Sequence, residues 1–93
     1  MASGEQNHLA FSPWFEKTLR ALKKKNPDLI RAFSQQLPKI LKDPELGKPL
    51  QHTLRNYRRI HIEGSFVLLY EYKKPEVRLI DLDHHDKIYK KYS

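Results

Sequence analysis

The hydrophobic period of this chain changes about halfway along, and that change constrains the fold more than any other feature. Residues 14–41 place apolar side chains at helical intervals, whereas Ile60 and Ile62 alternate with polar neighbours at the interval of a strand. Residues 66–72 are apolar almost throughout, as expected of a central strand covered on both faces. A helical half followed by a strand-forming half predicts an α+β domain.

Both predicted helices open on a capping residue followed by proline, as Ser12-Pro13 and Asn26-Pro27. The second pair stops one helix and starts the next, so the two helices should form an antiparallel hairpin. Pro38 lies inside the second helix and predicts a kink or a break near Leu37. The apolar positions of the two stripes are Trp14, Phe15, Leu19 and Leu22 in the first helix and Leu29, Ile30, Phe33, Leu37, Ile40 and Leu41 in the second.

The whole chain is predicted to form an antiparallel sheet with the helical hairpin packed on one face, in the order β-α-α-β-β-β with a short C-terminal tail or helix. Alternation puts Ile60 and Ile62 on one face of their strand and Arg59 and His61 on the other, which is the face away from the helices. The remaining predicted segments are an edge strand at His8–Phe11, a loop at 43–49, turns at 63–65 and 73–76, strands at 66–72 and 77–82, and a tail at 83–93.

Ninety-three residues suffice for one domain, which we place at residues 8–93, with residues 1–7 as a disordered tail or cloning remnant. The chain has no cysteine, which excludes disulfides, a thiolate nucleophile and thiolate metal sites and fits a reducing cytoplasm. The longest fully apolar run, residues 66–70, is far shorter than the roughly 18 residues that cross a bilayer. The polar N-terminus is no signal peptide, so a cytoplasmic protein without a membrane partner is expected.

Eighteen Lys and Arg residues against eleven Asp and Glu residues give a formal net charge of +7, which favours a polyanion or an acidic protein as partner. A basic surface without any ligand is the alternative. The distribution of the cations favours a ligand, because residues 46–62 contain no acid at all. That segment holds Lys48, Arg55, Arg58 and Arg59, with His52 and His61 among them.

Histidine and arginine on an acid-free strand are suited to cleaving RNA without a metal. The 2′-hydroxyl attacks the neighbouring phosphate, so the protein needs only a base, an acid and positive charge. His61 and His85 are the candidates for proton transfer, provided that the fold brings the tail to the strand. Arg59 shares a face with His61, whereas Arg58 points away and either supports the site from the other face or pairs with an acid.

Other residues extend this candidate site. Lys48 adds a cation, and Tyr57, Tyr89 and Tyr92 are available to stack on unpaired bases. The run Asp-His-His-Asp at residues 83–86 lacks the spacing of a metal site, because adjacent residues seldom bind one ion well. We therefore expect neither a metal nor another cofactor.

The segment Leu-Gln-His-Thr-Leu-Arg-Asn-Tyr-Arg-Arg-Ile-His-Ile at residues 50–62, followed by Phe-Val-Leu-Leu-Tyr, resembles the RelE/ParE superfamily of toxin–antitoxin toxins. The similarity is greatest to the YafQ-like branch, whose pattern is approximately L-Q-G, Y-R, H-V, a hydrophobic strand ending in Y, and a late T-H. The matching positions here are Leu50-Gln51, Tyr57-Arg58, His61-Ile62, Tyr70 and His84-His85. With the helical hairpin, the resemblance covers nearly the whole domain.

The resemblance implies a ribosome-dependent mRNA endoribonuclease that enters the ribosomal A site, contacts mRNA and rRNA, and is inhibited by a cognate acidic antitoxin. His61 and His85 match its catalytic histidines, with Arg59 beside them. Lys48 stands where the branch has another histidine, Ser65 where it has an acidic residue, and Val67 where the wider RelE group often has arginine. The RNA or phosphate contacts expected around this centre are Lys48, Arg55, Arg58, Tyr57, Lys87 and Tyr89.

Two other functions fit the same fold. A ParE-like toxin would bind DNA gyrase, and its binding surface would have no need of acid–base histidines. A catalytically weakened RelE homologue would act mainly as an antitoxin-binding module. The departures at Lys48 and Ser65 favour this second alternative, because serine cannot replace a carboxylate as a base.

Overall fold

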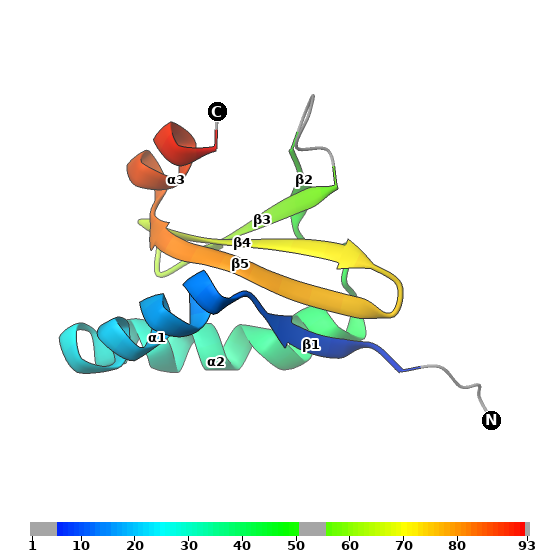
Figure 1. The fold of residues 1–93 in the computed structure, drawn as a ribbon, viewed down its shortest axis with the longest axis horizontal. Coiled ribbons are helices and arrows are strands. Elements are labelled where there is room, and N and C mark those ends of the chain that lie inside the picture. Colours follow the sequence, from blue (N-terminus) through cyan, green and yellow to red (C-terminus); the bar gives the residue numbers. More distant parts are fainter. Residues whose placement is uncertain (1–5, 51–55, 93) are drawn as a thin grey trace.

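The predicted elements follow one another in the expected order in the computed structural model, which describes residues 6–50 and 56–92 (Figure 1), and one short strand that was not predicted lies between the second helix and the last three strands. The α+β class is confirmed, and the tail forms a third helix. Arg55 and His52, which the sequence places in the basic segment, lie outside the described residues. The elements are β1 (His8–Phe11), α1 (Pro13–Lys25), α2 (Pro27–Lys42), β2 (Lys48–Pro49), β3 (Tyr57–Ile62), β4 (Phe66–Lys73), β5 (Glu76–His84) and α3 (His85–Lys91).

Helices α1 and α2 begin where the sequence predicts, each on a side-chain cap. The backbone N–H of Phe15 donates to the Ser12 hydroxyl at 3.0 Å, and that of Leu29 donates to the Asn26 side chain at 3.2 Å. Each cap satisfies one of the donors that the first turn of a helix leaves without a partner. None of the described helices is both long and apolar enough to cross a membrane.

Two expectations for the helical hairpin are corrected. Helix α2 has no break near Leu37, because it runs without interruption through Pro38, and the alternative of a kink stays a prediction. Pro38 and Ser34, whose carbonyl loses its usual helical donor, are both exposed, so water can replace the missing bond. Trp14 does not join the core stripe: it is 54% exposed at the start of α1, whereas its neighbour Phe15 is fully buried.

The sheet has the strand order β1-β5-β4-β3-β2. The pairs β3–β4 and β4–β5 are antiparallel, as predicted, and the short strand β2 adds a further antiparallel pair with β3. Strand β1 runs parallel to β5, so the sheet is mixed. His8 aligns with Glu76 and Phe11 with Leu79 in that parallel pair. Hydrophobic alternation does not specify the direction of a strand, and the two partners are nearly at opposite ends of the chain.

The helical hairpin covers one face of the sheet, and α3 lies on the other face (Figure 1). Between the hairpin and the sheet, the Phe15 ring packs 5.5 Å from Phe11 and 5.7 Å from Phe33, measured between centroids. The main core therefore forms without any residue of α3. Its fully or almost fully buried members are Phe15, Leu29, Phe33, Ile40, Ile62, Leu68, Tyr70, Val77, Leu79 and Leu82.

Asn7, which the sequence analysis assigns to the tail, belongs to the folded domain. Its side-chain amide donates to the Leu41 carbonyl at 2.8 Å, and the Tyr72 hydroxyl lies 3.3 Å from its carbonyl oxygen. These bonds join the start of the chain to α2 and to β4.

A buried tyrosine fixes the loop that leads into β2. The Tyr70 hydroxyl accepts a hydrogen bond from the Gly47 N–H at 2.8 Å and donates one to the Pro44 carbonyl at 2.8 Å. A Cβ atom at position 47 would lie 2.7 Å from the Tyr70 hydroxyl and 2.8 Å from the Arg59 carbonyl, so only glycine fits there. This loop sets the position of Lys48, which follows it directly.

Candidate active site

One row of residues crosses the sheet face that lies away from α1 and α2. The register sets Lys48 beside Arg59, Arg59 beside Leu69, and Leu69 beside Asp81. Strand β2 was not predicted from the sequence, and it is this strand that brings Lys48 next to Arg59. Two neighbouring cations are suited to binding a phosphate group.

His61 lies two residues beyond Arg59 on β3 and shares its face, as alternation predicts. It is paired with Val67, which in turn is paired with Asp83. The His61 side chain is exposed, so a substrate lying on this face can reach the imidazole.

Arg58 points to the opposite side, which confirms the predicted division between the two adjacent arginines. It pairs with Tyr70, whose ring lies in the core beneath the helices. Its guanidinium donates to the carbonyl of Gly47 at 2.7 Å and to that of Glu45 at 3.2 Å. Arg58 therefore supports the loop that precedes Lys48, and a contact of Arg58 with RNA stays a prediction.

Helix α3 brings a tyrosine of the tail against Arg59. The Arg59 guanidinium donates a hydrogen bond to the Tyr89 hydroxyl, and the guanidinium carbon lies 5.5 Å from the centroid of the Tyr89 ring. Ile88 is 1% exposed and anchors the helix, whereas Tyr89 is 38% exposed and can still contact a ligand. The hydrogen bond to the Tyr89 hydroxyl orients the arginine at the surface of the site.

His85 opens α3 next to the β3–β4 turn. Its backbone N–H donates to the Ser65 carbonyl at 2.9 Å, so the fold does bring the tail to the strands that carry the site. The His85 ring lies 6.1 Å from the Tyr89 ring and stacks on His84 at 4.9 Å, between centroids. Its Nδ1 atom lies 3.0 Å from an Asp86 carboxylate oxygen, which leaves Nε2 as the nitrogen available to a substrate.

Comparison with known proteins assigns the family. The sequence model described as ParE toxin of type II toxin-antitoxin system, parDE, matches residues 9–89. The chain belongs to this family, within the RelE/ParE toxin superfamily. A Methanocaldococcus jannaschii protein named toxin RelE4 is 36% identical over 81 residues, which cover 85% of this toxin and 86% of that protein.

Solved structures share the fold of the toxin at lower identity. YoeB of Staphylococcus aureus is 17% identical and superposes with a TM-score of 0.74 over 87% of this chain and 99% of that chain. A chain of the E. coli DinJ-YafQ toxin-antitoxin complex is 21% identical, with a TM-score of 0.67 over 91% of this chain and 99% of that chain.

A cluster of charged residues between the end of α3 and β5 of the toxin was not predicted from the sequence. Asp81 is 1% exposed and accepts hydrogen bonds from the Lys91 ammonium at 2.7 Å and from the Tyr92 hydroxyl at 3.0 Å. Burial, and then the Asp81 charge, raise the pKa of the Tyr92 phenol well above its ordinary value. Burial alone would lower the pKa of Lys91, but hydrogen bonds to Asp81 and Asp83 raise it. The available signal was Asp81 between Ile80 and Leu82, two apolar residues of β5.

Three side chains of the types that can bind a metal ion lie close together at the start of α3 of the toxin. Ligand atoms of His84, His85 and Asp86 all lie within 4.8 Å of one another. Ion pairs within the group account for this closeness, because Asp86 lies 4.0 Å from His84 and 3.0 Å from His85. The absence of a metal requirement stays a prediction.

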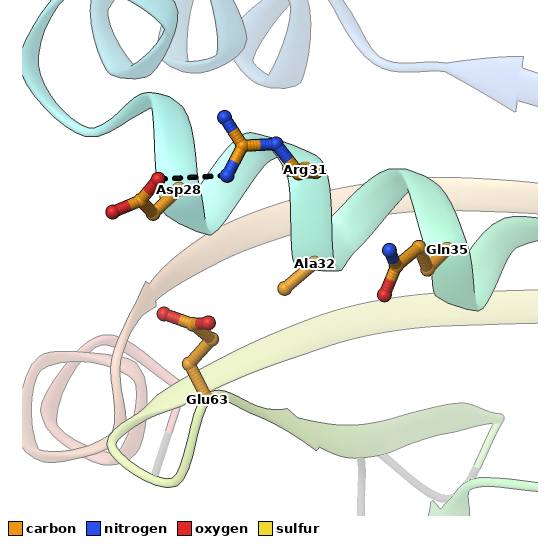
Figure 2. A pocket seen from close by; sticks show the side chains of 5 residues that line it. All are labelled: Asp28, Arg31, Ala32, Gln35 and Glu63. Atoms are coloured by element: carbon orange, nitrogen blue, oxygen red, sulfur yellow. Dashed lines mark hydrogen bonds and ion pairs between the residues drawn. The ribbon is translucent and has the colours of Figure 1, made fainter.

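A polar hollow lies on the helical side of the toxin, between α2 and the β3–β4 turn (Figure 2). It encloses about 350 Å³ and is lined by Asp28, Arg31, Ala32, Gln35 and Glu63. Arg31 is paired with Asp28 at 2.8 Å, and the Glu63 side chain points toward α2 (Figure 2). Its carboxylates would repel a phosphate, so the hollow does not extend the candidate site.

Proposed function

We propose that this toxin is a ribosome-dependent mRNA endoribonuclease that inhibits translation and needs no metal or cofactor. One observation carries the proposal. His61, Arg59 and Lys48 share one open face of the sheet, and α3 sets His85 and Tyr89 at that same face.

The groups of this face supply what RNA cleavage requires. One imidazole of the pair His61 and His85 takes the proton of the 2′-hydroxyl as that oxygen attacks the adjacent phosphorus. The other imidazole gives a proton to the leaving 5′-oxygen, so the products are a 2′,3′-cyclic phosphate and a 5′-hydroxyl. Arg59 and Lys48 stabilise the charge that builds on the phosphate. Tyr89 stacks on an unpaired base, and its hydroxyl orients Arg59.

The proposal includes two kinds of partner. The substrate is the mRNA in the ribosomal A site, with rRNA around it, which places the toxin in the cytoplasm. The inhibitor is a cognate acidic antitoxin. The DinJ-YafQ relative is a toxin–antitoxin complex, and a net charge of +7 suits an acidic inhibitor.

The proposal is tested by adding the purified toxin to an in vitro translation reaction and mapping the ends of the message by primer extension. We expect cuts spaced by codons that require ribosomes and that disappear in a His61→Ala/His85→Ala variant. The match to the ParE model makes gyrase the second candidate target. Intact message together with loss of plasmid supercoiling by gyrase would support that target instead. If the toxin shows neither effect, antitoxin binding would be its main function.

A further inference from the structure

A buried carboxylate lies on the sheet face that carries the candidate site, and it takes no part in the proposed mechanism. Asp81 of β5 is 1% exposed. One of its oxygens accepts from the Leu82 N–H at 2.8 Å, and the other accepts from Lys91 at 2.7 Å and from Tyr92 at 3.0 Å. Burying a carboxylate is unfavourable unless it is paired and hydrogen-bonded, so Asp81 depends on these partners.

Both side-chain partners of Asp81 belong to the last turn of α3 and its C-cap. Lys91 is the last residue of the helix, and Tyr92 is its C-cap. The Lys91 ammonium also lies 3.1 Å from Asp83, which faces the same side of the sheet two residues further along β5. The end of α3 is therefore attached to two carboxylates of β5, and we call these four residues the α3 latch.

Helix α3 needs such an attachment. It has seven residues, and isolated helices shorter than roughly 12–15 residues are marginal in water. It is fixed at its start by the bond from His85 to Ser65, in its middle by the buried Ile88, and at its end by the latch. His85 is at the first of these points, and Tyr89 lies between the first and the last.

We propose that the α3 latch holds the helix against the sheet so that Tyr89 contacts Arg59 and His85 stays beside Tyr89, which makes Asp81 and Lys91 positioning residues of the site. This inference rests on the proposed nuclease function. Its structural half is independent of that function, because the main core is built from α1, α2 and the sheet without α3. Opening the latch should therefore release α3 while the rest of the domain stays folded.

The chain contains its own reporter of the latch. Trp14 is the single tryptophan, and the Lys91 ammonium lies 5.7 Å from the centroid of its ring. A cation held over an indole affects its emission, so release of α3 should change the fluorescence of Trp14. The readout needs neither ribosomes nor RNA.

The test compares Lys91→Met with Lys90→Met, which removes the same charge from the neighbouring exposed residue of α3. We expect Lys91→Met to change Trp14 emission and to speed amide exchange in α3, with little change in the exchange of β4. Cleavage at saturating ribosomes should slow by roughly 10²-fold, since misplacement by about 1 Å can cost that much. Lys91→Arg should restore all three, and Lys90→Met should resemble the wild type.

A further variant covers the case in which Lys91→Met does not fold, because that change leaves the buried Asp81 charge with fewer partners. Asp81→Asn combined with Lys91→Met removes both charges of the pair, and it should fold yet cleave slowly. Both variants lack the Lys91 ammonium beside Trp14, so their emission changes whether or not α3 is released, and amide exchange in α3 is the decisive readout. Unchanged exchange of α3 in either folded variant would overturn the latch. Faster exchange of α3 with wild-type cleavage would overturn the positioning role. A wild-type toxin that cleaves nothing would overturn the nuclease function and with it the positioning role, and amide exchange in α3 would then decide the latch.

Discussion

At the scale of single residues, the sharpest test compares the two candidate catalytic histidines, His61 and His85, with His84, which precedes His85 in the chain. If His61 and His85 share proton transfer, each alanine variant should slow single-turnover cleavage by roughly 10²-fold or more. The double variant should lose little beyond the slower single one, because residues that act as a unit are not additive. His84 has the same chemistry but packs edge-to-face against Phe66, 5.7 Å between centroids, at the end of β5, so His84→Ala should cleave nearly as the wild type does.

The outcomes of this comparison separate two errors. Slow cleavage by His84→Ala with normal cleavage by His85→Ala would mean that the match to the family pattern is shifted by one residue. Normal cleavage by His61→Ala, His84→Ala and His85→Ala would exclude histidine acid–base catalysis.

Tyr70 gives a prediction about stability. Tyr70→Phe leaves the Gly47 N–H and the Pro44 carbonyl without their buried partner, and each lost partner of this kind costs about 1–3 kcal/mol. The free energy of unfolding in urea should therefore fall by about 2–6 kcal/mol, the sum for the two groups. Tyr72→Phe is the matched control: its hydroxyl makes one longer bond of 3.3 Å to Asn7, so we expect a loss of about 0.5–1 kcal/mol. Equal losses in the two variants would contradict the role of Tyr70 in the loop.

At the scale of elements, the latch should weaken in alkali. The pKa of Tyr92 is raised above its ordinary value of 10.0 by burial and by Asp81, and smaller contributions come from Tyr57 and Asp83. A phenol with a raised pKa keeps its proton in the docked helix at a pH where the released helix has lost it. Docking is therefore most stable below about pH 10 and weakens as the pH rises through the raised pKa. The raised pKa of Lys91 acts in the same direction.

This dependence can be followed through the emission of Trp14 in a titration from about pH 8 to about pH 12. The wild-type emission should change above about pH 10, before the far-ultraviolet circular dichroism reports loss of the sheet. Tyr92→Phe removes the titrating phenol of the latch and should therefore reduce the change in Trp14 emission. The same change in Tyr92→Phe as in the wild type would show that the phenol does not control docking.

An element could be predicted from the sequence where the interactions that determine it lie within a few residues or within one strand. The starts of α1 and α2 were predicted because Ser12 and Asn26 cap residues only three positions away. The face shared by Arg59 and His61 was predicted because alternation is a property of a single strand. The parallel pairing of β1 joins segments near opposite ends of the chain, and the latch at Asp81 depends on how α3 folds back onto β5. Periodicity within one element carries no information about either contact.

At the scale of the whole molecule, the positive charge should appear in the salt dependence of binding to ribosomes. Lys48 and Arg59 lie side by side, and Arg55 belongs to the same acid-free segment. Three phosphate contacts predict that log affinity falls against log salt with a slope of about −2 to −3. Arg59→Ala should weaken binding and turnover together and reduce that slope by about 1. Affinity that does not change with salt would contradict electrostatic binding.

The antitoxin should use another part of the surface, at the β1 edge of the sheet. Strand β1 is paired with β5 on one side, and a shallow groove of about 300 Å³ runs beside it. The residues of the groove combine an apolar floor with a mainly basic rim, which suits an acidic amphipathic segment added as a strand or a helix. They are Phe11, Glu16, Leu19, Arg20 and Lys23.

We therefore expect a pull-down from the native organism to recover a small acidic protein whose binding protects the amides of β1 or α1 from exchange. Lys23→Glu should weaken the complex, because it reverses a charge on the rim of the groove. Lys39→Glu reverses an equally exposed charge in the last turn of α2, outside the groove, and should bind the antitoxin as the wild type does. If protection appeared only at α3 and β3, the antitoxin would instead cover the proposed active site directly. In that case Lys23→Glu and Lys39→Glu would bind equally well, and Arg59→Ala would weaken the complex.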